Sequence, residues 1–201
     1  GKRLVKTLLA RKGATVYFLL RKESERKVPE LLEYWGTTKA RAIPVFGDLT
    51  SKKLGVAADD IKGLKGDIDA LFHLAAVYDL KADEETQIQA NIEGTRNVVE
   101  FAKAIDAKHL HHVSSIAAAG LYEGVFREDM FDEAENLDHP YFNTKHESEK
   151  IVRKECKVPW TVYRPAFVVG DSQTGEMGTG HGPYSVSKLI QTTGQCGRRG
   201  C

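Results

Sequence analysis

Continuous apolar runs alternate along the chain with stretches in which apolar residues recur at helical spacing. Two of the runs, TVYFLL at 15–20 and IDALFHLAA at 68–76, are typical of strands buried on both faces. Further strands are predicted at 40–49, at the start of 109–120 and at 159–170, and helices at 2–12, 28–35, 84–104 and 140–156. Because strands alternate with helices, we predict an α/β fold with a doubly wound parallel sheet.

Composition narrows the class of protein without identifying a function. The 201 residues suit one domain, and a hydrophobic content of 41% is typical of a globular chain. The 29 basic and 28 acidic residues leave a net charge of +1, which favours neither nucleic acid nor an acidic membrane surface as a partner. No apolar run approaches the roughly 20 residues of a membrane span. Three cysteines make no disulfide framework, so we expect a cytoplasmic protein.

The end of the chain departs from the domain pattern. The segment GQCGRRGC at 194–201 is rich in glycine and has no apolar period. We therefore predict one domain over residues 1–191 and a disordered or non-native tail over 192–201.

The histidines do not predict a metal site. His109, His111 and His112 flank and enter one predicted strand, where alternate side chains point to opposite faces. His73 is expected to pack in the core. We assign no metal to the chain.

Residues suited to ligand binding follow several of the predicted strands. In a parallel sheet the carboxyl ends of the strands meet at one edge, where ligands bind near the point at which strand order reverses. The residues at these ends are Arg21 and Lys22, Asp48 and Leu49, Ala75 and Ala76, and Ser114 and Ser115. A helix that carries Tyr141 and Lys145, four residues apart, follows the last pair. Each feature alone is weak, whereas their occurrence in this order is specific.

The motifs together resemble the extended short-chain dehydrogenase/reductases, which have a Rossmann-like fold. The matching segments are GDLT (47–50), HLAA (73–76), NIEGT (91–95), VSSIAAAG (113–120), YFNTK (141–145) and YRPAFVVG (163–170). The resemblance covers about residues 1–177. It is nearest to the thioester and fatty-acyl reductase branch, as VYFLLRK followed by GDLTSKKLG indicates.

The resemblance implies catalytic roles that physical chemistry supports. Tyr141 would exchange a proton with the substrate carbonyl, and the positive charge of Lys145, one helical turn away, would favour its phenolate. Ser115 would donate a hydrogen bond to the carbonyl oxygen. Ser114 is the competing serine, and Ser115 is preferred because it lies five residues before Gly120. Asn91 matches the helical asparagine of the family and would have a supporting role.

The same resemblance implies a dinucleotide cofactor. In relatives that prefer NAD an acidic residue ends the second strand of the family fold, whereas this chain has Arg21 and Lys22, which could pair with a 2′-phosphate. We therefore expect NADP(H), with NAD(H) possible. The other expected cofactor contacts are Gly1, Asp48, Leu49, Ala75, Ala76, Ser114, Lys145 and Pro165.

The phosphate-binding turn of the family is expected to be incomplete. Gly1 fits the last glycine of G-x-x-G-x-x-G, so the first strand and two glycines would precede the chain, and the substrate-binding part would stop after about Met177. We therefore expect an internal fragment that is itself inactive.

We expect the whole enzyme to be an NADPH-dependent oxidoreductase that transfers hydride to a small-molecule carbonyl or acyl thioester. The alternatives are an NAD-dependent nucleotide-sugar epimerase or dehydratase, and a non-catalytic dinucleotide-binding redox sensor. The basic end of the 15–20 strand argues against the first alternative. The Tyr141, Lys145 and Ser115 set argues against the second.

Overall fold

The computed structural model describes residues 1–76, 83–166, 168–170 and 173–175. These fall into two compact units, Gly1–Arg164 and Pro165–Cys201, and all the helices and strands below belong to the first. The predicted boundary between a domain over 1–191 and a tail over 192–201 lies outside the described residues.

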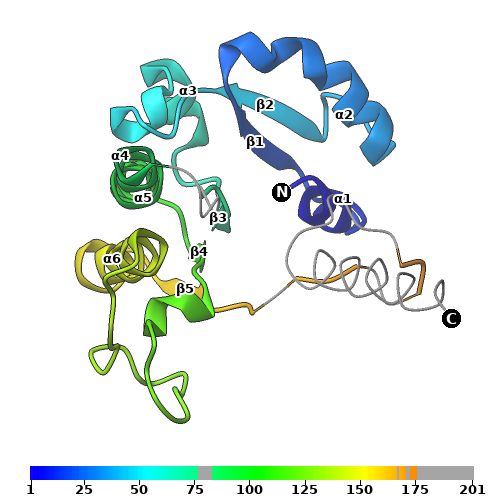
Figure 1. Cartoon of the computed structure of the whole chain (residues 1–201). Coiled ribbons are helices and arrows are strands. Elements are labelled where there is room, and N and C mark those ends of the chain that lie inside the picture. The colour runs from blue at the N-terminus through cyan, green and yellow to red at the C-terminus, as the bar shows by residue number, and fades with distance from the viewer. Residues whose placement is uncertain (77–82, 167, 171–172, 176–201) are drawn as a thin grey trace, which may run out of the picture. The chain divides into compact units, whose positions relative to one another are not determined.

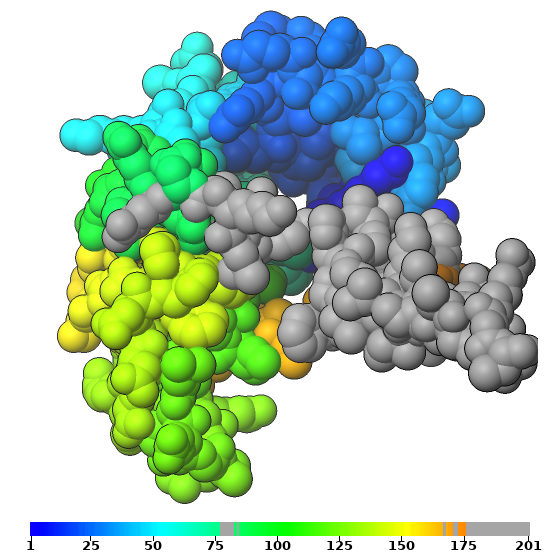
Figure 2. All heavy atoms as spheres, viewed as in Figure 1, coloured from blue at the N-terminus to red at the C-terminus, as the bar shows by residue number. Residues whose placement is uncertain are grey.

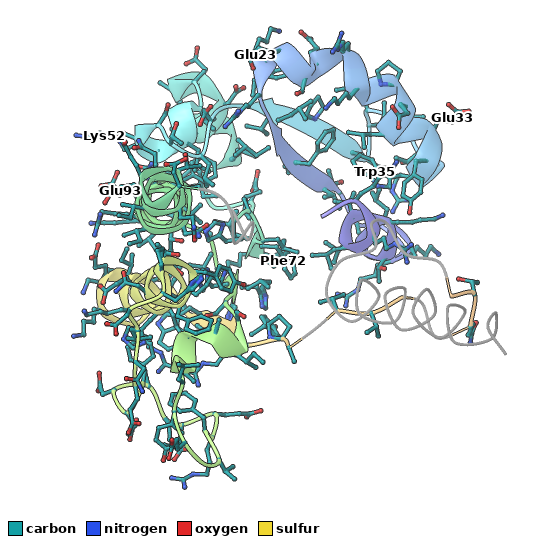
Figure 3. The ribbon with its side chains drawn as sticks, viewed as in Figure 1. Glu23, Glu33, Trp35, Lys52, Phe72 and Glu93 are labelled. Carbon is teal, nitrogen blue, oxygen red and sulfur yellow. The ribbon has the colours of Figure 1, made fainter. Side chains whose placement is uncertain are left out.

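The first parallel sheet pairs β1 (Val16–Leu20) with β2 (Ala42–Phe46) (Figure 1). Helices α1 (Lys2–Leu9) and α2 (Val28–Trp35) pack against one of its faces. The Trp35 ring meets Phe18 edge-on at 5.0 Å, and its Nε1 donates a hydrogen bond to the Lys2 carbonyl at 2.9 Å (Figure 3).

The other face of β1 differs from the prediction. Tyr17 is 41% exposed and Leu19 40%, so the expectation that this strand is buried on both faces is wrong for the described residues. The reason is that α1 and α2 cover the Phe18 side of the strand. An apolar run predicts a strand, but the burial of each face depends on what packs against it.

The second parallel sheet has the order β3 (Leu71–His73), β4 (Leu110–Val113) and β5 (Trp160–Tyr163). Helices α5 (Gly94–Ala104) and α6 (Pro140–Glu155) lie side by side along it (Figure 1). The main core lies between this sheet and the helices, with α3 (Ala58–Leu64) at its border; buried members include Leu64, Val98, Phe101, Ile105, Leu110, Ile151 and Val152.

The helix predicted over 84–104 has an interruption that its sequence did not reveal. It consists of α4 (Glu84–Gln87), a π-helical turn η3 (Ile88–Glu93) and α5. The π turn contains the buried Asn91.

Several predicted elements are shorter than expected. Strands at 68–76 and 159–170 contract to β3 and β5, because their ladder with β4 spans only three and four residue pairs. The helix predicted at 2–12 ends at Leu9, and Gly13, with φ 79°, turns the chain toward β1. The short helices η1 (Lys22–Lys27), η2 (Lys52–Gly55), α3 and η4 (Ile116–Ala119) were not predicted.

The two sheets share no strand pair among the described residues, since no ladder joins β1 to β3. In the part of the chain that is described, no helix is long and apolar enough to cross a membrane.

Candidate functional site

The Lys145 side chain, on α6, reaches the carboxyl end of β4. The residue is only 4% exposed, and its Nζ donates a hydrogen bond to the Val113 carbonyl at 3.2 Å. Ser114 and Ser115 follow Val113 directly, so the structure brings the lysine and the end of this strand together. Tyr141 lies one helical turn before Lys145 and is partly exposed.

The start of α6 fixes where Tyr141 enters the helix. The His139 ring caps the helix by accepting a hydrogen bond from the Tyr141 amide at Nδ1, at 3.1 Å, and Pro140 occupies the first helical position. Local sequence therefore sets the register of the Tyr141–Lys145 pair on α6.

Burial controls the charge of Lys145. Loss of solvent lowers the pKa of its ammonium to about 8, and the negative charge of Glu149 opposes this shift. The ammonium is therefore closer to its titration point at neutral pH than an exposed lysine would be.

The two serines have different hydrogen-bonding roles. Ser114 is buried and donates its hydroxyl proton to Glu149 Oε2 at 2.8 Å. The Ser115 hydroxyl is partly exposed and accepts a hydrogen bond from the Ala117 amide at 3.1 Å, which caps η4. Accepting that bond leaves the Ser115 proton available to donate, whereas the Ser114 proton is already used.

Asn91 connects the π turn to α6. Its side-chain Nδ2 donates a hydrogen bond at 3.2 Å to Oγ1 of Thr144, the residue before Lys145. Its backbone carbonyl accepts the hydroxyl proton of Thr95 at 2.6 Å. Thr95 thus accepts, and does not donate, in its 3.0 Å hydrogen bond with His73 Nε2. This chain of bonds assigns the proton of neutral His73 to Nε2.

Two buried histidines face the Lys145 region. His73 packs in the core as predicted, and His112 pairs with it across the β3–β4 ladder with ring centroids 5.1 Å apart. Burial, and then the charge of Lys145, lowers the pKa of His112 to about 3; burial, followed by His112 and Lys145, also lowers the pKa of His73 well below its usual value. Both imidazoles are therefore neutral at physiological pH.

Sequence reasoning missed Glu149, which is 0% exposed. It receives hydrogen bonds from Ser114, from Arg153 Nε at 2.8 Å and from Arg164 Nη2 at 2.6 Å. Burial raises the pKa of this carboxyl, but the hydrogen bonds from Arg164, Arg153 and Ser114 outweigh it and hold the pKa below its ordinary value. Its spacing of four from Lys145 was the one signal in the sequence.

The predicted cofactor residues Arg21 and Asp48 meet at the ends of β1 and β2. Arg21 Nε lies 3.1 Å from Asp48 Oδ2, and Thr50 donates two hydrogen bonds to Asp48 Oδ1. Those bonds from Thr50, and more weakly the charge of Arg21, lower the pKa of Asp48. Arg21 also lines an open pocket of about 350 Å³, whose other lining residues are Thr50, Asp83, Glu85, Thr86, Gln89 and Ala90.

Lys22 does not line this pocket. Its Nζ pairs with Glu25 at 2.7 Å and lies over the Phe46 ring. Leu49 instead has a packing role: its side chain lies so close to Gly94 that a Cβ there would come within 2.7 Å of Leu49 Cγ, which explains the glycine of NIEGT.

The remaining residues predicted to contact the cofactor do not line the pocket beside Arg21. Gly1 is exposed before α1, Ala75 and Ala76 follow β3, and Pro165 belongs to the second unit. Within the described ranges, no group of three or more histidine, cysteine or acidic side chains is arranged to hold a metal ion.

Comparisons with known proteins show which family the chain resembles. The family model described as Male sterility protein, an NAD-binding family, matches residues 1–197. One of the subunits of linear gramicidin synthase from Brevibacillus parabrevis is 32% identical over 190 residues, which are 87% of this chain and 4% of that protein. Aldehyde reductase lnaA of Aspergillus flavus is 29% identical over 168 residues, or 78% of this chain and 16% of that protein.

A solved structure extends the likeness to three dimensions. The terminal R domain from the myxalamid PKS-NRPS biosynthetic pathway matches with a TM-score of 0.75 and 29% identity, over 88% of this chain and 48% of that one. The chain thus spans less than half the length of each of these three proteins. The family match over nearly the whole chain shows that it belongs to the extended short-chain dehydrogenase/reductases, in the male sterility branch that resembles fatty-acyl reductases.

Proposed function

We propose that this chain is the NAD(P)-binding catalytic core of a reductase that acts on a carbonyl or acyl-thioester substrate. The observation that carries the proposal is the buried Lys145, hydrogen-bonded to the end of β4 beside Ser115 and one helical turn from Tyr141. The relatives of the chain include an aldehyde reductase and the terminal R domain of a biosynthetic pathway, and these support the proposed substrate class.

Each member of the set has a role that its surroundings support. Tyr141 gives its phenolic proton to the carbonyl oxygen, and the Lys145 ammonium stabilises the phenolate that remains. Ser115 donates its free hydroxyl proton to the same oxygen and stabilises the charge that develops there. Asn91 holds Thr144 and thereby the helix beside Lys145. When bound, the reduced nicotinamide supplies the hydride for the carbonyl carbon.

The cofactor is proposed to be NADPH, with its adenosine end at the pocket beside Arg21. The pocket volume falls within the range of small-ligand sites, and the Arg21 guanidinium suits a 2′-phosphate. Asp48 competes for the same guanidinium, so binding requires Arg21 to exchange a carboxylate for a phosphate. An exposed pair of this kind is weak, which makes the exchange feasible.

Cofactor oxidation by the intact protein tests the proposal. NADPH and NADH would each be offered with a panel of aldehydes and the corresponding acyl thioesters. We expect substrate-dependent oxidation, faster with NADPH. Cofactor binding without oxidation by any carbonyl or thioester would favour a redox sensor instead, and NAD-dependent interconversion of nucleotide sugars would favour an epimerase.

A further inference from the structure

Glu149 joins three elements at the candidate site through a carboxylate that is fully buried. Its oxygens accept from Ser114 at the end of β4, from Arg153 on its own helix α6 and from Arg164 at the end of β5. Lys145 lies one turn earlier on the same helix. A single side chain therefore contacts both the strand that ends at the serines and the helix that carries the tyrosine and lysine.

Stability alone does not explain a carboxylate at this position. Desolvating a charged pair costs as much as the pair regains, and apolar side chains of similar volume often stabilise a core equally well. The position of Glu149 beside a functional lysine points to a second reason for a charge there.

The titratable groups around Lys145 come from three elements. His73 of β3 and His112 of β4 face it as neutral imidazoles, and Glu149 faces it from α6. Among these described groups Glu149 is the one whose charge favours the ammonium, and it opposes the effect of burial.

We infer that Glu149 is a positioning residue for the proposed reaction: it fixes Ser114, and with it the adjacent Ser115, to α6, and its carboxylate favours the charged form of Lys145 one helical turn away. This inference rests on the proposed function, because it acts through Ser115 and Lys145.

Arg164 extends the same network to the segment before α6. Its Nη2 donates to the Met130 carbonyl at 2.9 Å, and its guanidinium lies 5.2 Å from the centre of the Phe126 ring. In the space-filling view, residues 121–139 form a lobe next to α6 (Figure 2). Glu149 thus also anchors, through Arg164, the segment that leads into the Tyr141 helix.

Glu149→Gln in the intact protein tests the electrostatic part. Glu155→Gln is the matched control, because Glu155 lies on the same helix but is exposed and pairs with Arg96 at 3.5 Å. The titration of Lys145, followed by NMR of labelled lysine, is a readout that does not require turnover. Without the Glu149 charge the Lys145 ammonium loses its proton at lower pH, so the titration midpoint should move below about 8.

The pH profile of kcat supplies the second readout. The basic limb should move to lower pH in Glu149→Gln, with kcat at pH 8 reduced about 10-fold and KM unchanged, since part of the general-acid contribution is lost. Glu155→Gln should change neither readout. A folded Glu149→Gln protein with the parental Lys145 midpoint would overturn the inference.

Ser114→Ala tests the positioning part and also covers the case in which Glu149→Gln does not fold. It leaves both arginine pairs of Glu149 intact and removes only the bond to β4. We expect about a 10-fold lower kcat with an unchanged Lys145 midpoint. A parental kcat would overturn the inference. The proposed function is tested separately by Tyr141→Phe. Full activity of that variant would reject the proposed function, whatever the titration of Lys145 shows.

Discussion

At the scale of single residues, the hydroxyl protons of Ser114 and Ser115 distinguish two neighbours that a motif cannot separate. The Ser114 proton is donated to Glu149, while the Ser115 oxygen accepts from an amide and its proton stays available. In the proposed mechanism, the choice between the two serines depends on Glu149, a residue 35 positions later in the chain than Ser114. The motif VSSIAAAG could therefore identify the pair, but not the hydrogen bonds that divide their roles.

Ser115→Ala should lower kcat on the order of 10²-fold, by loss of a donor to the developing charge on the carbonyl oxygen. Ser114→Ala should cost about 10-fold, since it acts only through the placement of its neighbour. Steady-state kinetics of both variants show which serine donates to the carbonyl oxygen. If Ser114→Ala is the more damaging change, the assignment of Ser115 is wrong.

Arg21→Ala should weaken NADPH binding by about 10-fold or more and leave NADH binding nearly unchanged, because only NADPH loses a charge-assisted pair. Lys22→Ala is the matched control, since Lys22 pairs with Glu25 and does not line the pocket. Calorimetric titration of both cofactors into the three proteins measures the preference. If the ratio of the NADPH and NADH affinities is the same in Arg21→Ala as in the parent, the proposed role of Arg21 is wrong.

At the scale of secondary structure, the sequence predicted the order of elements better than their burial or internal geometry. Apolar period placed α2, β1 and α6 within one or two residues. It could not reveal the π turn at Ile88–Glu93, because the helical period is the same before and after the turn and changes only in phase. Nor could it reveal Glu149 and Arg164 as partners, since they meet only when α6 packs against the end of β5.

The buried imidazole of His112 should make the stability of the β3–β4 sheet depend on pH. Its pKa is about 3 in the folded protein and 6.5 in an unfolded chain, so below pH 6.5 the unfolded chain takes up a proton that the native state does not. The free energy of unfolding therefore decreases as the pH decreases below about 6.5. The His112 contribution should be a loss of about 2 kcal/mol between pH 7 and pH 5.

Denaturant unfolding at these two pH values tests this expectation with His112→Phe. Between pH 7 and pH 5, the free energy of unfolding of the variant should decrease by about 2 kcal/mol less than that of the parent. His109→Gln is the control, because His109 packs beside His111 on the other face of this sheet, where Tyr163 and Phe72 also lie. Equal pH dependence in the parent and in His112→Phe would show that His112 is not the responsible group.

At the scale of the molecule, two parallel sheets bring two groups of candidate site residues to the carboxyl ends of their strands. Arg21 and Asp48 meet beyond β1 and β2, while Lys145, Ser114 and Ser115 meet beyond β4. The sequence could predict this gathering, because parallel strands of an α/β fold end at a common edge. It could not predict that α1 and α2 cover just one face of β1, because that depends on which elements pack there.

The most direct test of the account is turnover by Tyr141→Phe in the intact protein, measured together with the affinity for NADPH. The substitution removes one hydroxyl and keeps the ring, so Lys145 and the Arg21 pocket stay in place. We expect kcat to fall at least about 10²-fold, because the proton donor is gone, and the Kd for NADPH to stay unchanged. Turnover within a few-fold of the parental rate would contradict the assignment of Tyr141, and with it the proposed reductase mechanism.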